Sequence, residues 1–322
     1  MTDPPMTWRL ILGILLVSGC QQFDPDPDPD PNLDDVGLLE LPIFGQDDLV
    51  EIITWNVEHF PKFGETTILL MKSLIRDFSA DLYFFQEIEN INVLADLVDE
   101  LDDYGLAAGL GSHDSGLVLV YRKEMINIDA VTEIATENPF THYFAYRPPI
   151  EVKCDWNNGL KEISLTLVNI HLKCCGDGLM EMGNDDDEEF RRYAANQYLH
   201  DYVSNIVGQD NVIIAGDWND ILTESEDTNI FWPLLSDSSE FIFVDLEIAS
   251  GDSTAWSWPG WNSAYGAAHF DHIGINRNLF DKIEIDMSTV VTIPIEEYFR
   301  NGSEAYEMYL SDHRPVMWTF TP

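Results

Sequence analysis

The sequence is poor in basic residues and in cysteine. Its 322 residues include 16 Lys and Arg against 58 Asp and Glu, which gives a formal net charge of −42. So few basic side chains exclude the usual nucleic-acid-binding module, which carries clustered Lys and Arg. Four cysteines are too few for a disulfide scaffold in a chain of this length.

Several familiar site signatures are also missing. The chain has no CxxC or HExxH spacing for zinc, and no glycine-rich phosphate loop that ends in Lys. Zinc-dependent and nucleoside-triphosphate chemistry are therefore not indicated. Hydrophobic residues nevertheless make up 45% of the chain and aromatic residues 12%, enough to bury a substantial core.

The acidic charge restricts the medium in which the protein works and the molecules that it can bind. An acidic surface repels nucleic acid and anionic lipid at low salt. Near molar salt the screening length falls to about 3 Å, and the repulsion largely disappears. The composition fits a saline extracellular medium, and it fits a merely soluble acidic protein equally well.

The apolar run near the N-terminus is too short to cross a bilayer. Residues 10–17 supply about 8 apolar residues where about 20 are needed, so they are read as the hydrophobic part of a secretion signal. The string Leu16-Val17-Ser18-Gly19-Cys20 resembles the processing box of bacterial lipoproteins, in which the Cys becomes the lipidated first residue. We expect a signal peptide over residues 1–19 and a lipid anchor at Cys20, which would hold the protein at the cell envelope or outside the cell. The alternative is an ordinary cleaved signal in which Cys20 is incidental.

An acidic spacer follows the expected anchor. Residues 24–31 alternate Asp and Pro, so the charges repel and proline removes backbone donors. Such a segment should be extended by about 3.1 Å per residue. No later stretch has linker composition. We therefore expect the lipidated Cys and linker over residues 20–48 and one folded domain over residues 49–322.

Short apolar runs alternate with helical periodicity along the domain. Strands are expected at residues 51–57, 82–85, 117–121, 164–170, 212–215, 269–275 and 316–320. Helices are expected at residues 66–78, 91–101 and 188–207. The last helix follows the acidic run 185–189, which suits a helix N-terminus better than a metal loop. The mixture predicts an α/β or α+β fold with strands in both directions.

Acid, amide and imidazole side chains recur where these strands end. If the ends share one rim, the side chains converge; they are Asn56, Glu87, His171, Asp217, Asn219, Asp271, Asp312 and His313. Oxygen ligands without thiolates favour Mg²⁺, Mn²⁺ or Ca²⁺. Two histidines beside such a metal supply a general base and a general acid near neutral pH. The set suits in-line displacement at phosphorus.

Six segments resemble, in order, the motifs of the endonuclease/exonuclease/phosphatase superfamily. They are Thr54-Trp55-Asn56, Phe85-Gln86-Glu87, Val168-Asn169-Ile170-His171, Gly216-Asp217-Trp218-Asn219, Phe270-Asp271-His272-Ile273 and Ser311-Asp312-His313-Arg314-Pro315-Val316. The resemblance covers nearly the whole domain. It implies a deoxyribonuclease I-like fold, a four-layer α/β/β/α sandwich with two mixed β-sheets, and a metal-dependent phosphoric ester hydrolase.

The resemblance also implies a metal site. Glu87 would be the main ligand, and Asn56 and Asp312 would complete the site for Mg²⁺, or for Mn²⁺ or Ca²⁺.

An acid–base set is implied in the same way. His171 and His313 would form the imidazole pair, with His313 as the base and His171 as the acid. Asp217 and Asn219 would face the phosphate and the water, and a role of Asp217 as base or second metal ligand stays open. Asp271 would orient His313.

A predicted hairpin places Arg147 at the same rim. Residues 146–153 and 164–170 flank the turn signal Asn157-Asn158-Gly159, and a hairpin centred there pairs positions that sum to about 316. Arg147 would then face Asn169, next to His171, where a guanidinium suits phosphate binding. The alternative is an ordinary surface Arg.

The same register separates the cysteines. It sets Cys154 opposite Glu162, on the order of 30 Å from Cys174 and Cys175, so Cys154 should stay a free thiol. Cys174 and Cys175 either bridge each other or remain thiols.

Other polar residues are expected to have plainer roles. In the nuclease branch of the superfamily a Glu often supports the first His; Asp114 stands in that neighbourhood here and is the candidate substitute. His272 should point to the sheet face opposite Asp271. The remaining imidazoles are expected to be surface or structural groups: His59, His113, His142, His200 and His269.

Three functions remain open. The first is a tethered endonuclease that cleaves extracellular DNA, although its acidity opposes DNA binding. The second is a phosphomonoesterase or a lipid-headgroup phosphodiesterase with the same chemistry. The third is a catalytically inactive binding lipoprotein, which the retention of His171 and His313 disfavours. A monomer is the default expectation.

Overall fold

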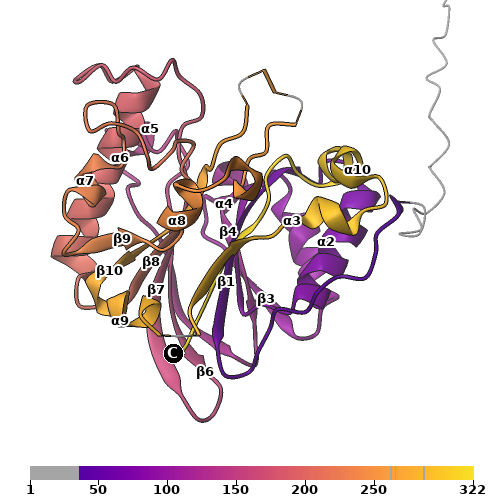
Figure 1. The fold of residues 1–322 in the computed structure, drawn as a ribbon. Coiled ribbons are helices and arrows are strands. Elements are labelled where there is room, and N and C mark those ends of the chain that lie inside the picture. Colours follow the sequence, from indigo (N-terminus) through magenta and orange to yellow (C-terminus); the bar gives the residue numbers. More distant parts are fainter. Residues whose placement is uncertain (1–35, 262, 265, 286) are drawn as a thin grey trace, which may run out of the picture.

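The apolar runs form two six-stranded sheets in the computed structural model, which describes residues 36–322 except 262, 265 and 286 (Figure 1). The first sheet has the order β11-β12-β1-β2-β4-β3, with β1 Val50–Phe60, β2 Leu82–Ile88, β3 Tyr104–Ala107, β4 Val118–Arg122, β11 Thr289–Thr292 and β12 Val316–Phe320. The second has the order β5-β6-β7-β8-β10-β9, with β5 Ile126–Glu133, β6 Ile150–Asn157, β7 Glu162–His171, β8 Val212–Asp217, β9 Phe241–Phe243 and β10 Asp271–Asn276. Each sheet contains one parallel pair, β1–β2 or β7–β8, among antiparallel neighbours.

Helices cover the outer face of each sheet (Figure 1). The first sheet is covered by α2 Glu65–Phe78, α3 Ile91–Asp99 and α10 Gly302–Tyr309. The second is covered by α5 Phe140–Tyr143, α6 Glu188–Tyr202 and α7 Trp232–Leu235. Three short helices lie in connections: α4 Ser112–Ser115, α8 Leu246–Ala249 and α9 Phe280–Ile283. The predicted four-layer sandwich with two mixed sheets is confirmed.

Neighbouring apolar residues on a strand serve different layers. Phe84 packs between the sheets, whereas Phe85 packs under α2 and α3. Ile213 and Ile214 divide in the same way between the inner core and the layer under α6. Side chains alternate across a strand, so strands covered on both faces read as unbroken apolar runs.

The acidic run before α6 acts as a helix start. Asp187 is the N-cap residue, and its side chain accepts a hydrogen bond of 2.7 Å from the amide of Phe190. The α-helix ends at Tyr202, and a π-helical turn Val203–Val207 completes the predicted helix.

The β6–β7 register differs from the predicted one. Cys154 lies opposite Leu165, three residues beyond the expected Glu162, and the pairing starts at Asn157 and Glu162. The turn is longer than assumed because its two asparagines organise it. The side chain of Asn157 accepts from the amide of Gly159, and that of Asn158 accepts from the amides of residues 160 and 161.

The packed chain begins earlier than residue 49. Val36 and Leu41 are buried in the core under α2, and Leu38 forms a bridge with Phe299. The predicted signal peptide, Cys20 and the Asp-Pro spacer lie outside the described residues. In the part of the chain that is described, no helix is long and apolar enough to cross a membrane.

Candidate active site

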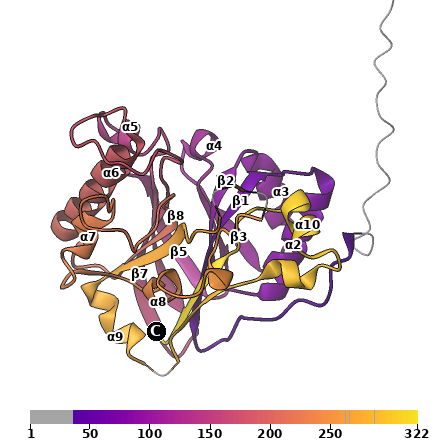
Figure 2. The same ribbon diagram turned by 45° about the horizontal axis from the view of Figure 1, so that its top comes forward.

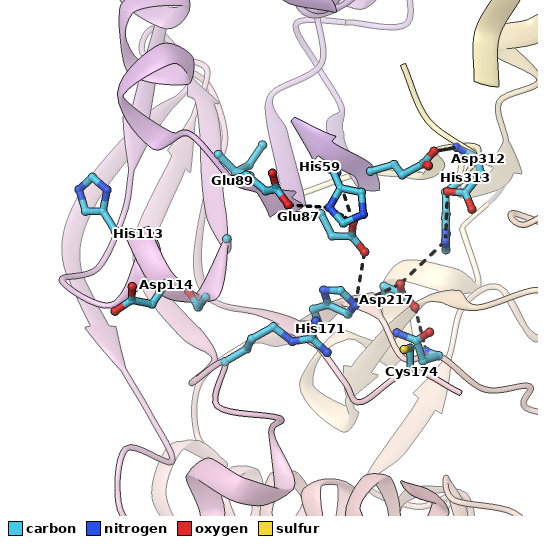
Figure 3. A pocket seen from close by; sticks show the side chains of 16 residues that line it. His59, Glu87, Glu89, His113, Asp114, His171, Cys174, Asp217, Asp312 and His313 are labelled. Atoms are coloured by element: carbon cyan, nitrogen blue, oxygen red, sulfur yellow. Dashed lines mark hydrogen bonds and ion pairs between the residues drawn. The ribbon is translucent and has the colours of Figure 1, made fainter. Parts of the chain in front are cut away.

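The polar strand ends meet at one edge of the sandwich, between the two sheets (Figures 1 and 2). They line a cavity of about 810 Å³ to which β1, β2, β7, β8 and the segment before β12 all contribute (Figure 3). The structure brings seven of the predicted site residues to this cavity or its wall. They are Glu87, Arg147, His171, Asp217, Asn219, Asp312 and His313. Asn56 and Asp271 lie just beneath it, bonded to members of this set.

Several cavity residues have left-handed backbone conformations. Glu58, His59, Glu87 and Asn219 have φ values of 38°, 59°, 60° and 55°. Such values are costly for residues with a Cβ atom and cluster at functional sites. All four line the cavity. Glu58 and His59 lie where the β1–β2 pairing is irregular, Glu87 lies near the end of β2, and Asn219 follows β8.

Three interior hydrogen bonds join the two sheets below the cavity. The amide nitrogen of Gln86 on β2 donates to Asn169 on β7 at 2.8 Å, and Asn169 donates to the carbonyls of Phe85 and Val118. Within the second sheet β7 and β8 approach closely at Gly216, where a Cβ atom would overlap the carbonyl of Ile170. The structural role of Gln86 had no signal in the sequence beyond its place next to Glu87.

Asn56 acts as a donor that joins two carboxylates. Its amide nitrogen lies 3.0 Å from Glu87 Oε1 and 2.8 Å from Asp217 Oδ2. Its oxygen accepts the amide of Glu58 at 3.0 Å. Asn56 therefore steadies Glu87 and Asp217 through its nitrogen, and its role as a metal ligand stays a prediction.

His313 is held by a carboxylate on its outer side. Its Nδ1 lies 2.7 Å from Asp271 Oδ2, and its Nε2 lies 4.0 Å from Asp217 and 3.9 Å from Asp312. Burial alone would lower the pKa of His313, but these carboxylates outweigh burial and raise the pKa well above its usual value. His313 therefore carries a proton at neutral pH.

His171 has the opposite electrostatic setting. Its Nε2 lies 3.5 Å from Asp217 Oδ2 and 3.9 Å from Glu87 Oε1. Burial lowers the pKa of His171 well below its usual value, and the nearby Arg147 and His313 lower it further. His171 is therefore neutral. The directions of these two shifts favour His313 as the proton donor, whereas His313 is expected from the resemblance as the base and His171 as the acid; the assignment of the two roles stays a prediction.

The expected support of His171 by Asp114 is not found. Asp114 is exposed on α4, and Figure 3 shows it apart from His171. The Nδ1 atom of His171 is buried without a hydrogen-bond partner. Packing, and not a carboxylate, orients this imidazole.

Asp217 lies between the two imidazoles and is only 1% exposed. Burial raises its pKa to about 7, although the charge of His313 and the hydrogen bond from Asn56 oppose the shift. Its other oxygen accepts the amide of Asn219 at 2.8 Å, which fixes the turn that follows β8. A carboxylate with this pKa can exchange a proton near neutral pH.

Asp312 is held by two groups that the sequence did not single out. Glu58 accepts the amide of Asp312 at 2.8 Å, and Trp258 Nε1 donates to its carboxylate at 2.9 Å. Burial raises the pKa of Glu58, and the charge of Asp312 adds to this effect. His59 and Glu89, 2.7 Å apart, form an exposed pair at the rim next to Glu87.

The lining residues fit a divalent cation. Among the described residues the cavity is lined by six carboxylates and by one arginine, Arg147. Such an excess of negative charge is costly unless a cation compensates for it. Oxygen ligands such as Glu87 and Asp312 suit Mg²⁺, Mn²⁺ or Ca²⁺.

Arg147 reaches the rim from the loop before β6, and not from the strand itself. Its Nη2 donates to the carbonyl of Leu172 at 2.5 Å, and the side-chain Nδ2 of Asn219 donates to the same carbonyl at 3.2 Å. Its buried Nε has no partner. A guanidinium keeps its charge even though burial lowers its pKa, so the free donor suits an anionic ligand.

The three cysteines among the described residues form no disulfide. Cys154 is buried and free, as expected, and Cys174 and Cys175 are free thiols as well. His272 lies on the face of β10 opposite Asp271, also as expected, and contacts the rings of Phe231 and Phe243.

Known proteins share this fold at low sequence identity. A humanized TDP2 from D. rerio has a TM-score of 0.58 and 16% identity, with 85% of this chain and 100% of that chain covered. The human Nocturnin catalytic domain, solved with a sulfate anion, has a TM-score of 0.56 and 14% identity over 88% of this chain and 96% of that chain. A Bacteroides vulgatus protein described as an endonuclease/exonuclease/phosphatase has a TM-score of 0.56 and 17% identity over 84% and 98%. No curated protein sequence matches the chain.

A family model agrees with the geometry. The model described as the endonuclease/exonuclease/phosphatase family matches residues 53–313, which is most of the chain and contains the whole cavity. Members of this family are metal-dependent phosphoric ester hydrolases. The chain belongs to the endonuclease/exonuclease/phosphatase family.

Proposed function

We propose that this protein is a metal-dependent phosphodiesterase that cleaves DNA outside the cell. The observation that carries the proposal is the placement of the Asp217 carboxylate between two imidazoles, at 3.5 Å from His171 and 4.0 Å from His313. The expected proton acceptor Asp217, the expected proton donor His313 and the carboxylates of the metal site thus face one cavity.

The residues divide the work of hydrolysis. Mg²⁺ or Mn²⁺ bound at Glu87 and Asp312 would supply stabilisation for charge on the phosphate. Asp217 accepts the proton of the attacking water, which Asn219 helps to orient. His313, kept protonated by Asp271, donates a proton to the leaving oxygen. This assignment replaces the expectation that His313 is the base.

Two groups bind the phosphate. Arg147 offers its unpartnered Nε to a non-bridging oxygen. Neutral His171 donates a hydrogen bond from Nε2, the nitrogen that faces the cavity residues Glu87 and Asp217. Both donors are buried, so they act in surroundings where electrostatic interactions are strong.

The choice of DNA has one argument on each side. A TDP2 from D. rerio is described in complex with a single-strand DNA product, so this fold accommodates DNA in that protein. The charge of −42 opposes DNA binding at low salt, and high salt relieves the repulsion. A small phosphate ester is the second candidate substrate, favoured by the single arginine among the described lining residues.

We further propose that the enzyme is tethered outside the cell. The lipoprotein-like box before Cys20 supports a lipid anchor, and the Asp-Pro spacer would hold the catalytic domain away from the membrane.

Nicking of supercoiled plasmid by the full-length protein tests the function. Reactions at low and near-molar salt with Mg²⁺, Mn²⁺ or EDTA are compared with the same reactions of Glu87→Gln. We expect metal-dependent nicking that rises with salt and is lost in the variant. Parallel assays use bis-p-nitrophenyl phosphate and p-nitrophenyl phosphate. Cleavage of these esters without nicking would favour the second candidate, and no cleavage of any substrate would refute both.

A further inference from the structure

A second cluster of one carboxylate and two imidazoles lies directly behind the active site. Asp245, at the start of α8, is 0% exposed, as is His272 on β10; His269, just before β10, is 1% exposed. His272 follows Asp271 in sequence but points to the opposite face of the sheet. The cluster therefore cannot touch a substrate in the cavity.

Hydrogen bonds show that His272 is a cation. Its Nδ1 lies 2.6 Å from Asp245 Oδ2, and its Nε2 lies 3.1 Å from the carbonyl of Asp220. Both partners are acceptors, so both ring nitrogens carry protons. Burial opposes this charge, but Asp245 outweighs burial and raises the pKa of His272.

The cluster is not a metal site, although its ligand atoms lie within 4.8 Å of one another. His269 Nδ1 accepts the amide of Ser257 at 3.0 Å, so its proton sits on Nε2, which donates to Asp245 at 3.1 Å. Metal binding through that Nε2 would require an imidazolate. The second oxygen of Asp245 is also used, because it accepts the amide of Ile273 at 2.9 Å.

The residues that are hydrogen-bonded to the cluster belong to two loops that carry active-site residues. Asp220, which receives the bond from His272, follows Asn219 in the turn after β8. Ser257, which is bonded to His269, accepts the amides of Phe270 and Asp271 through its hydroxyl, each at 3.1 Å. The next residue, Trp258, holds Asp312.

We propose that Asp245, His269 and His272 form a positioning cluster that fixes the two loops carrying Asn219 and Trp258, and so sets the geometry of the catalytic residues. This inference rests on the proposed hydrolysis. The bond from His272 to the Asp220 carbonyl is its critical contact, since it is the direct link from the cluster to the Asp217–Asn219 turn.

Two variants separate this contact from the buried charge pair. In His272→Asn, the shorter amide can replace Nδ1 toward Asp245 but cannot reach Asp220. In Asp245→Asn, both charges disappear together, and a neutral His272 still donates from Nε2 to Asp220. Asp245→Asn leaves no charge in the cluster. His272→Asn keeps the buried Asp245 carboxylate with hydrogen-bond donors in place of its cation, so the free energy of unfolding of both variants is measured before their kcat values are compared.

The test measures kcat and KM on bis-p-nitrophenyl phosphate together with hydrogen exchange of the amides of residues 218–221. For His272→Asn we expect kcat to fall about 10- to 100-fold at nearly constant KM, because a small misplacement of catalytic groups has that effect. Exchange should rise at residues 218–221 and stay unchanged in β7. For Asp245→Asn we expect kcat within about threefold of wild type and protected amides at residues 218–221.

Three results would overturn the inference: equal loss of kcat in both variants, unchanged kcat in folded His272→Asn, or unchanged exchange at residues 218–221 in that variant. Failure of the proposed function is recognised separately, because wild type would then cleave no ester. The exchange measurement still decides the positioning role in that case.

Discussion

Two clusters of aspartate and histidine lie on opposite faces of β10, and they behave differently. The outer cluster, Asp217, Asp271 and His313, opens to the cavity; the inner cluster, Asp245, His269 and His272, is closed. In the outer cluster Asp271 Oδ1 is buried without a partner, and Asp217 has a pKa raised by burial to about 7. In the inner cluster every ring nitrogen and both Asp245 oxygens are bonded.

The comparison shows that residue type and proximity do not define a catalytic site. Both clusters meet the same distance criterion for a metal site. What separates them is hydrogen-bond capacity left over for a ligand, together with access from the cavity. A buried ion pair whose hydrogen-bonding atoms all have partners stabilises the fold. A buried ion pair that keeps unpartnered atoms beside a cavity can take part in a reaction.

The largest expected effect concerns the outer cluster. His313→Asn removes the proton donor, so kcat for bis-p-nitrophenyl phosphate should fall about 10³-fold. His200→Ala, an imidazole on α6 away from the cavity, is the control and should keep the wild-type rate. A folded His313→Asn enzyme with near-normal kcat would remove the outer cluster from the chemistry.

Metal binding should depend on the carboxylates that line the cavity and not on the inner cluster. Glu87→Gln removes the carboxylate at the centre of the acidic lining, and calorimetric titration with Mn²⁺ should show affinity about 10- to 100-fold weaker than wild type. Glu89→Gln, at the exposed rim, is the matched control and should bind almost normally. Equal losses in the two variants would place the ion elsewhere. Loss of binding in Asp245→Asn would make the inner cluster a metal site after all.

Phosphate binding should depend on a buried donor that has no hydrogen-bond partner, and not on one whose donors are all bonded. Arg147→Ala removes an unpartnered buried donor, so KM should rise about 30-fold, or roughly 2 kcal/mol, with a smaller change in kcat. Arg192 is buried but bonded to Asp220 and two carbonyls. Arg192→Ala should therefore destabilise the fold without a specific KM effect. An unchanged KM in Arg147→Ala would make this residue a structural arginine.

The pH dependence of stability tests the inner cluster. Asp245 has a lowered pKa, so its contribution is present above the unfolded value of about 3.9 and is lost as pH falls through the folded value. His272 has a raised pKa, so its contribution is full below about 6.5 and is lost as pH rises through the folded value. Urea unfolding of wild type and Asp245→Asn should differ by about 1.5 kcal/mol between these limits and by less outside them. A difference that does not change with pH would exclude a charged pair.

The strands that carry the site were predictable from the sequence. Runs such as residues 51–57 and 212–215 are buried on both faces, so apolar content alone marked them, and the polar residues that ended them converged as expected. β5 was missed because its residues alternate in exposure and include several polar side chains. The β6–β7 register was missed because the side chains of Asn157 and Asn158 lengthen the turn.

Contacts across long sequence distances were not predictable. The support of Asp312 by Glu58 and Trp258 joins residues 254 and 54 positions apart. The inner cluster likewise forms only because α8 packs against β10. The sequence around Asp245 does not indicate which residues it contacts. The charge states of the site residues could not be predicted from the sequence either, because they depend on burial and on neighbouring groups in the folded protein.

A matched pair of amide variants tests the central claim most directly. Asp271→Asn and Asp245→Asn change the same chemical group in the outer and the inner cluster, and kcat on bis-p-nitrophenyl phosphate and the free energy of unfolding are measured for both. We predict that Asp271→Asn lowers kcat about 10³-fold with little loss of stability. Asp245→Asn should lower stability and keep kcat within about threefold. The reverse pattern, or equal losses of kcat, would contradict the assignment of chemistry to one face of β10 and positioning to the other.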